Sequence, residues 1–87
     1  MIMPKVLIYA TALCPYCIHA ERLLISKGVK DINKIRVDLQ PELRLEMMQK
    51  TGRRTVPQIY IGEQHIGGFD DLRALDMSGG LDPLLAQ

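Results

Sequence analysis

The chain has 87 residues, of which 47% are hydrophobic and 24% are charged, and its formal net charge is +1. This mixed composition excludes a disordered chain, and the length supports one modest hydrophobic core, so we expect a single domain over residues 1–87. The nearly balanced charge gives no electrostatic basis for binding nucleic acid or an anionic membrane, and no apolar run is long enough to span a bilayer.

The first half of the chain predicts a strand, a helix and a second strand. An apolar run at Lys5–Tyr9 is typical of a strand covered on both faces of a sheet. A helix follows at Pro15–Lys27, where apolar residues recur on one side and Gly28 suits a left-handed end. After a polar connection at Lys30–Lys34, the alternation of Ile35–Leu39 predicts the second strand. The helix between them makes the two strands parallel, in a βαβ unit.

The second half of the chain predicts a helix, a hairpin and two further helical pieces. Pro41 suits the first turn of a helix that ends at Gly52. Gln58–Ile61 and Gln64–Ile66 are expected to pair as a hairpin around a two-residue turn. Acidic residues then favour the start of a helix, and Leu81–Leu85 is a short helical piece after it. Together the elements predict an α/β fold with a mixed four-stranded sheet flanked by helices.

The two cysteines, Cys14 and Cys17, lie at the predicted turn from the first strand to the first helix. Their spacing puts both sulfurs on one side of the helix, close enough to form a disulfide. Backbone N–H groups and the helix dipole favour a thiolate at Cys14, whereas burial on the apolar side favours a neutral thiol at Cys17. We therefore predict Cys14 as an exposed nucleophile and Cys17 as the resolving thiol of thiol–disulfide exchange. The alternative is half of a zinc site, but His19 and His65 lack suitable spacing, and no metal site is predicted.

Four blocks of the sequence resemble the glutaredoxin family, in particular its bacterial dithiol members of the glutaredoxin-3 type. The blocks are Cys14-Pro15-Tyr16-Cys17, Thr55-Val56-Pro57-Gln58-Ile59, Gly67-Gly68-Phe69-Asp70-Asp71 and Gly79-Gly80-Leu81-Asp82-Pro83-Leu84-Leu85. The resemblance covers essentially the whole chain and implies a thioredoxin-like fold in which Pro57 follows a cis peptide bond. It also implies an enzyme, a glutathione-dependent thiol–disulfide oxidoreductase that reduces protein disulfides and protein–glutathione mixed disulfides.

The same resemblance implies a glutathione site beside the cysteines. Val56 would pair with the backbone of the tripeptide, and the N–H groups of Phe69 and Asp70 would bind its γ-glutamyl carboxylate. Asp71 would pair with its amino group, Tyr16 would flank the cysteinyl part, and Gln58 or an arginine would meet the glycyl end. The full set of predicted substrate-binding residues is Tyr16, Arg53, Arg54, Thr55, Val56, Pro57, Gln58, Gly68, Phe69, Asp70 and Asp71.

One departure from the family pattern lies three residues before Cys14, where relatives often carry a lysine and this chain has Thr11. Arg53 and Arg54 are predicted to replace the missing cation, because a guanidinium binds a carboxylate through two hydrogen bonds. The alternative for both arginines is a solvated charge in a loop. Asp70 is also predicted to cap the helix that follows it.

No permanently bound cofactor is expected, and glutathione enters as a co-substrate. The expected partners are glutathione and proteins that are disulfide-bonded or glutathionylated. The chain is expected to be a monomer, and it lacks a secretory signal, which predicts a cytoplasmic protein. An alternative function is a [2Fe–2S] carrier, in which two protomers share a cluster through Cys14 and two glutathiones, although Pro15 and the competing Cys17 disfavour it. A further alternative is a protein reduced by another protein in place of glutathione.

Overall fold

The structure is a computed structural model that describes residues 4–86. Its elements in chain order are β1 (Val6–Ala10), α1 (Pro15–Ser26), β2 (Ile32–Arg36), α2 (Pro41–Thr51), β3 (Gln58–Ile61), β4 (Gln64–Gly67), α3 (Phe69–Met77) and α4 (Leu81–Leu85). The strands form one sheet in the order β2-β1-β3-β4, with β1 parallel to β2 and the other pairs antiparallel. The predicted mixed four-stranded sheet is therefore confirmed. None of the helices in the described part of the chain is both long and apolar enough to cross a membrane.

The predicted bounds of the second strand are wrong. β2 ends at Arg36, and Val37–Leu39 forms a turn instead of continuing the strand. β2 lies at the edge of the sheet and pairs with β1 alone, so the polar residues that looked like a connection can face water within the strand. Val37 is buried in the turn, where its N–H donates to the C=O of Ala10 at 3.0 Å. The apparent alternation thus combines the end of a strand with a buried turn residue.

The helix ends and the hairpin agree with the predictions more closely. Gly52 closes α2 with a φ of 71°, and Gly28 follows the end of α1 with a φ of 93°, both in the region that favours glycine. β3 and β4 form the expected hairpin around Gly62 and Glu63. β4 continues through Gly67, and a register shift opposite Ile59 and Tyr60 makes a bulge in it.

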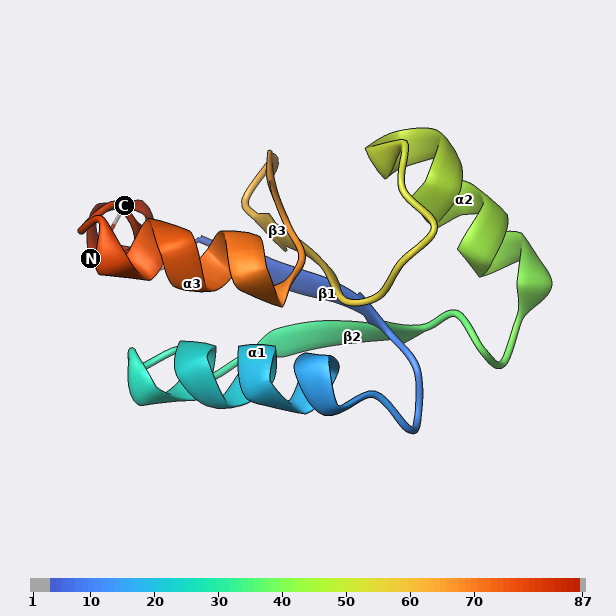
Figure 1. The fold of residues 1–87 in the computed structure, drawn as a ribbon, viewed down its shortest axis with the longest axis horizontal. Coiled ribbons are helices and arrows are strands. Elements are labelled where there is room, and N and C mark those ends of the chain that lie inside the picture. The colour runs from blue at the N-terminus through green and yellow to red at the C-terminus, as the bar shows by residue number, and fades with distance from the viewer. Residues whose placement is uncertain (1–3, 87) are drawn as a thin grey trace.

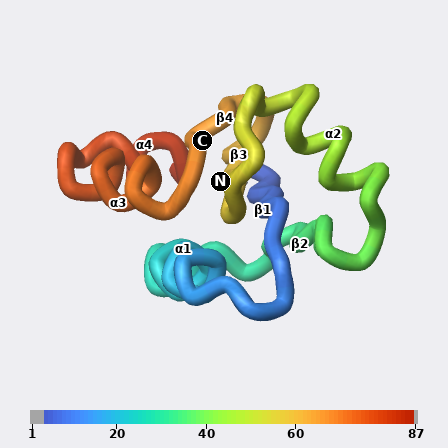
Figure 2. Tube along the Cα trace, turned by 45° about the vertical axis from the view of Figure 1, so that its right-hand side comes forward, coloured from blue at the N-terminus to red at the C-terminus, as the bar shows by residue number. Residues whose placement is uncertain are grey.

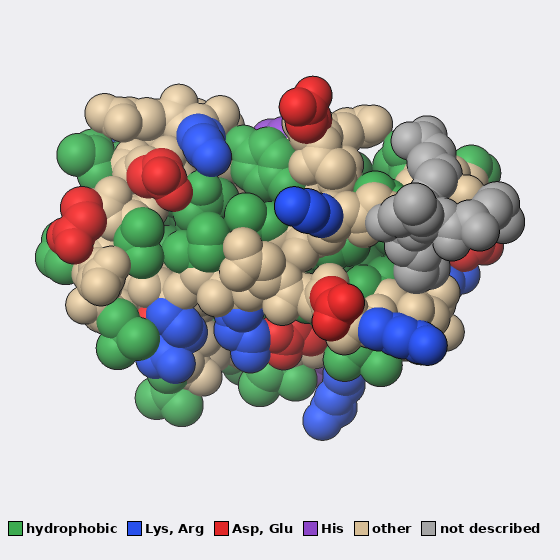
Figure 3. Space-filling view, turned by 180° about the vertical axis from the view of Figure 1, so that it is seen from behind, with side chains coloured by type: hydrophobic (Ala, Val, Ile, Leu, Met, Phe, Trp, Pro, Cys, Tyr) green, Lys and Arg blue, Asp and Glu red, His purple; other side chains and the backbone are tan. Residues whose placement is uncertain are grey.

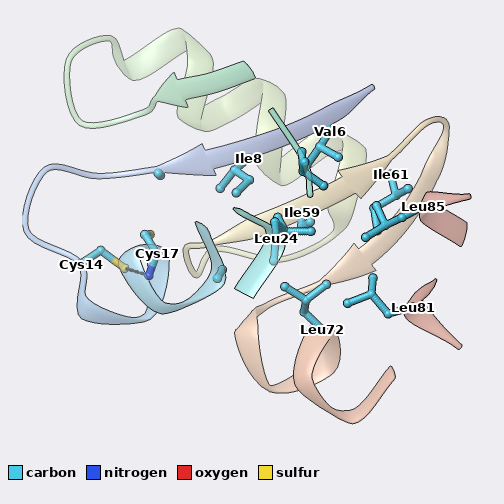
Figure 4. Close-up of a cluster of buried hydrophobic side chains, with 13 residues drawn as sticks. Val6, Ile8, Cys14, Cys17, Leu24, Ile59, Ile61, Leu72, Leu81 and Leu85 are labelled. Atoms are coloured by element: carbon cyan, nitrogen blue, oxygen red, sulfur yellow. Dashed lines mark hydrogen bonds between the residues drawn. The ribbon is translucent and has the colours of Figure 1, made fainter. Parts of the chain in front are cut away.

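The helices cover the two faces of the sheet unequally. Figures 1 and 2 show α1 and α3 on one side of the strands and α2 on the other. The first side holds the larger apolar cluster, in which Leu24 of α1 and Leu72 of α3 are fully buried against β1 and β3 (Figure 4). On the second side Met47 of α2 packs with Tyr9 and Val37.

Charges of both signs are interspersed over the surface. In the space-filling view of Figure 3, basic and acidic side chains alternate among apolar and neutral ones, with no large field of one sign on that face. This distribution agrees with the formal net charge of +1. The face therefore lacks the basic patch that binding to a polyanion requires.

Candidate active site

Cys14 occupies the N-cap position of α1. Its backbone is extended, with φ −132° and ψ 100°, and its Sγ accepts a hydrogen bond from the N–H of Cys17 at 3.2 Å. Pro15 takes the first helical position, where a missing N–H loses no intrahelical bond. The sulfur thus stands where serine or threonine oxygens commonly cap helices, and a negative charge on it is favoured there. Figure 4 shows this bond as a dashed line between the two cysteines.

Cys14 is less exposed than predicted. Its residue is 8% exposed, against 4% for Cys17, so both thiols count as buried although their order is as expected. The reason is the cap geometry, which turns the side chain back over the first turn of the helix. The Cys14 thiol also lies against the C=O of Val56, with Sγ 3.8 Å from the oxygen. Its chain neighbours Leu13 and Tyr16 are 95% and 60% exposed, so the sulfur lies just beneath the molecular surface.

The Cys17 thiol is held in its neutral form. Burial raises its pKa above its ordinary value, and the neighbouring Cys14 sulfur raises it further. The residue belongs to the buried side of α1 together with Ala20 and Leu24. Both cysteines are free thiols, so the structure represents the reduced pair. The geometry thus distinguishes Cys14, which caps the helix, from Cys17, which lies on its buried side.

The loop that leads into β3 faces the cysteines. The Val56–Pro57 peptide bond is cis, as the family resemblance implies, and Pro57 is buried. The start of α3 approaches the same loop from another side, because a Cβ added at Gly68 would lie 3.6 Å from the C=O of Pro57. Three segments far apart in the sequence thus converge near Cys14: the start of α1, the loop before β3 and the start of α3.

Gln58 does not lie where a ligand of glutathione is expected. Its side chain is completely buried, and its Nε2 donates to the C=O of Thr55 at 2.9 Å. Its Oε1 lies 2.8 Å from Nε2 of His65. The prediction of Gln58 at the glycyl end is therefore wrong, because its amide is used inside the protein. His65, to which no role was assigned, is the residue that the sequence reasoning missed here. No local pattern pointed to it, because its short strand is already polar at Gln64.

Asp71, and not Asp70, caps α3. The helix begins at Phe69, and Oδ2 of Asp71 accepts a hydrogen bond from the N–H of Gly68 at 2.9 Å. The same oxygen binds Nη1 of Arg53 at 2.8 Å, and the two side chains are 45% and 47% exposed. The Arg53 guanidinium and then the Gly68 N–H hold the pKa of Asp71 below its ordinary value. The predicted cap role of Asp70 is wrong because the helix starts one residue before it.

Aromatic side chains flank the start of α1 and α3. The rings of Tyr16 and Phe69 stack with centroids 6.4 Å apart, and the His19 ring lies 5.7 Å from Phe69. The N–H groups of Phe69 and Asp70 belong to the first turn of α3, where backbone donors have no intrahelical acceptor. The structure therefore brings the aromatic residues and these donors together, and adds His19 to them.

The remaining predicted residues lie in the exposed part of the loop. Arg54 and Thr55 are exposed, and the C=O of Arg54 accepts a hydrogen bond from Nη1 of Arg44 at 3.2 Å. On the other side of Cys14, the N–H of Ala12 donates to Asp38 at 3.2 Å, and Arg36 holds that carboxylate through two bonds of 2.7 Å. The segment before Cys14 is thus tied to the turn after β2.

Within residues 4–86, no group of three or more His, Cys, Asp or Glu side chains is arranged to hold a metal ion. A free cysteine pair in the first turn of a helix faces a cis-proline loop on a mixed four-stranded sheet. This combination defines the class of thioredoxin-like dithiol proteins.

Comparison with known proteins gives the particular family. The glutaredoxin family model matches residues 6–66. The chain is 58% identical over 84 residues to a glutaredoxin of Pseudomonas aeruginosa, covering 97% of this chain and 99% of the relative. It is 54% identical over 83 residues to glutaredoxin 3 of Escherichia coli, covering 95% and 99%. The chain belongs to the glutaredoxin family, a family of thiol–disulfide oxidoreductases.

Solved structures agree with the thioredoxin-like fold. The solution structure of glutaredoxin from Brucella melitensis is 51% identical and has a TM-score of 0.83, covering 95% of this chain and 89% of that one. A buckwheat glutaredoxin–glutathione complex is 29% identical and has a TM-score of 0.87, covering 95% and 77%. Glutathione is thus the co-substrate with which this family works.

Proposed function

We propose that this protein is a glutathione-dependent oxidoreductase that reduces protein disulfides and protein–glutathione mixed disulfides, with Cys14 as nucleophile and Cys17 as resolving thiol. The observation that carries this proposal is the Cys14 sulfur at the N-cap of α1, bound by the N–H of Cys17 at 3.2 Å. A helix dipole stabilises a negative charge at this position by about 0.3–1 kcal/mol. A hydrogen bond to a charged acceptor adds about 1.5–3 kcal/mol.

With a glutathionylated protein, the Cys14 thiolate attacks the glutathione sulfur. The Cys14–glutathione disulfide forms, and the protein leaves as a thiolate that takes a proton. A second glutathione, as its thiolate, attacks the glutathione sulfur of this intermediate. Oxidised glutathione leaves, and the Cys14 thiolate is restored. The net reaction exchanges one disulfide for another: the protein sulfur is reduced to a thiol, and the thiol of the incoming glutathione is oxidised as it joins the first glutathione in the disulfide that leaves.

With a protein disulfide, the Cys14 thiolate attacks one of the two sulfurs and forms a mixed disulfide. The S–S bond of the protein breaks, and its second sulfur leaves as a thiolate that takes a proton. Cys17 then loses its proton and attacks the Cys14 sulfur, which releases the reduced protein and leaves a Cys14–Cys17 disulfide. Two glutathiones reduce that disulfide. Because burial raises the pKa of Cys17, its deprotonation accompanies its attack, and the departing thiolate is the group that takes up the proton.

The start of α3 and the Arg53–Asp71 pair support binding of glutathione. A carboxylate offers about four lone-pair sites, and the described bonds from Arg53 and Gly68 use Oδ2 of Asp71. We place the amino group of glutathione at Oδ1 of Asp71 and its γ-glutamyl carboxylate at the N–H groups of Phe69 and Asp70. Arg53 bonds to Asp71 through Nη1, and its other N–H groups are the donors we assign to the glycyl carboxylate.

The test is turnover of a glutathionylated peptide with glutathione and glutathione reductase, followed by NADPH consumption. Cys14→Ser is expected to abolish turnover, at least a hundredfold, because no nucleophile remains. Cys17→Ser is expected to keep the reaction with the glutathionylated peptide and to lose reduction of protein disulfides. Equal activity of wild type and Cys14→Ser would refute the proposal.

The same preparations distinguish the alternative functions. Glutathione-dependent visible absorbance after anaerobic purification, with no turnover of mixed disulfides, would favour the [2Fe–2S] carrier. Reduction by a partner protein in the absence of any recycling by glutathione would favour the protein-reduced alternative. We also propose a single domain, a monomer and a cytoplasmic location, of which sedimentation and cell fractionation test the last two.

A further inference from the structure

Gln58 is the one polar side chain classed as buried among the described residues, with none of its surface exposed. A buried amide destabilises a protein unless its donors and acceptor are bonded, so its position calls for a physical reason. Here its polar atoms have partners within the protein. The partners belong to two different segments: Thr55 to the loop that faces Cys14, and His65 to β4.

The bonds fix which way the amide points. The atom 2.9 Å from the Thr55 carbonyl oxygen must be Nε2, because a carbonyl oxygen accepts and cannot donate. Oε1 then faces His65, so the ring nitrogen 2.8 Å away must carry the hydrogen. His65 is therefore the donor of this bond. Loss of the donor would leave a buried carbonyl oxygen without a partner and remove the bond that opposes rotation of the amide.

His65 is itself held in place by packing. Its ring lies against Tyr60 with centroids 5.0 Å apart, on the strand that pairs with its own. The bulge in β4 places His65 opposite Tyr60, two residues along β3 from Gln58. Successive side chains alternate across a strand, so Gln58 and Tyr60 point to the same face, where the His65 ring reaches both.

The other end of this chain of bonds reaches the active site. Thr55 precedes Val56, whose carbonyl oxygen lies 3.8 Å from the Cys14 sulfur. The bonds from Arg44 to Arg54, from Arg53 to Asp71 and between Arg53 and Thr51 are exposed and contribute little rigidity. The bond from Gln58 is part-buried, because its donor side chain is completely enclosed, so water competes with it less than with these exposed bonds.

We propose that His65, acting through Gln58, is a positioning residue for the loop 55–57 and thereby for the glutathionyl group that pairs with Val56. The inference rests on the proposed glutathione-dependent function. The His65 N–H orients the Gln58 amide, and this amide donates to the Thr55 carbonyl. That carbonyl belongs to the same peptide group as the Val56 N–H, so the bond fixes the direction of this group. His65 touches neither the reacting sulfur nor the substrate. It acts on recognition of the substrate and leaves the reactivity of Cys14 unchanged.

The test compares His65→Phe with His65→Gln. Phenylalanine keeps a ring against Tyr60 and removes the N–H donor, whereas glutamine keeps an N–H at a similar reach and removes the ring. Two rates are measured for each variant: kcat/KM with a glutathionylated peptide, and alkylation of Cys14 by iodoacetamide in a Cys17→Ser background. Thermal unfolding of each variant reports its stability.

We expect His65→Phe to lower kcat/KM about fivefold, the equivalent of one hydrogen bond, mainly through a higher KM. His65→Gln is expected to stay within twofold of wild type, and alkylation to be unchanged in both. Wild-type kcat/KM in His65→Phe would overturn the inference. So would equal losses in both variants, which would show a packing role, or slower alkylation, which would show an effect on Cys14. A wild-type protein that does not turn over the peptide at all would instead refute the proposed function on which the inference rests.

Discussion

On the face of the sheet covered by α1 and α3, thirteen buried residues form one cluster, whereas on the face covered by α2 the corresponding cluster contains Tyr9, Val37 and Met47. α2 gains a polar anchor instead, because the Tyr9 hydroxyl donates to Glu46 at 3.0 Å. Burial, followed by that bond, raises the pKa of Tyr9 to about 12, so the hydroxyl remains a donor at neutral pH. One face depends on apolar packing and the other largely on a few specific contacts.

The two parts of the active site are associated with different faces of the sheet. The cysteines belong to the first turn of α1, which the larger cluster holds through Ala20 and Leu24. The loop 53–57 follows α2 on the other face, and side-chain hydrogen bonds hold it to β3 and α3. The position of the nucleophile should therefore depend on core packing, and the position of the ligand loop on polar contacts. Substitutions that affect one and not the other test this difference between the two faces.

Leu24→Ala should have the largest effect on stability. Leu24 is completely buried in the larger cluster, and removing such a side chain costs about 2.7–5 kcal/mol of unfolding free energy. Urea unfolding followed by circular dichroism measures this change. The matched control is Ile25→Ala on the same helix, where the side chain is 60% exposed and a change within about 0.5 kcal/mol is expected. Similar losses in both variants would contradict the assigned packing of α1.

Met47→Ala should have a smaller effect on the other face. Met47 is also completely buried, but its cluster is small and lies under a single helix, so the site can collapse around the gap. We expect a loss near the lower end for such substitutions, about 2 kcal/mol. Leu45→Ala on the same helix, with a side chain that is 54% exposed, is the control. A loss as large as that of Leu24→Ala would show that the two faces are equally well packed.

The sequence predicted the first of these regions better than the second. The helix of Cys14 and Cys17 was predictable because its apolar spacing, its proline and its glycine are local signals that packing reinforces. The cis bond before Pro57 came from the family resemblance. The bounds of β2 were missed because a strand at the edge of a sheet can be polar, and its pattern then resembles a loop.

Local sequence patterns could not predict the polar contacts of the site. Arg53 and Asp71 are 18 residues apart in the sequence, and both looked free to bind a ligand until the fold brought them together. Gln58 looked like a ligand for the same reason, although it is buried against His65. Whether a polar side chain faces a ligand or a second side chain is decided by tertiary structure, which spacing along the chain does not report.

Asp71→Asn is expected to have the smallest effect on stability, and it tests the polar contacts that hold the loop 53–57. Asp71→Asn keeps an oxygen that can accept the Gly68 N–H and removes the charge that pairs with Arg53. Because the folded-state pKa of Asp71 is lowered, its charged form stabilises the folded protein above the unfolded value of about 3.9. That contribution is lost as the pH falls through the lower folded-state pKa. Solvent screening at a half-exposed pair keeps it at no more than about 1 kcal/mol.

Urea unfolding at pH 7 and at pH 3 measures this contribution. Asp71→Asn should be less stable than wild type at pH 7, and the difference should shrink at pH 3, because the carboxyl group of the unfolded chain binds a proton below about pH 3.9. Asp70→Asn is the matched control, because Asp70 lies in the same helical turn and near the same dipole, whereas the salt bridge with Arg53 is formed by Asp71. If Asp70→Asn loses as much stability as Asp71→Asn, the helix dipole accounts for the effect. A larger, pH-dependent loss in Asp71→Asn alone assigns it to the bond that ties the ligand loop to α3.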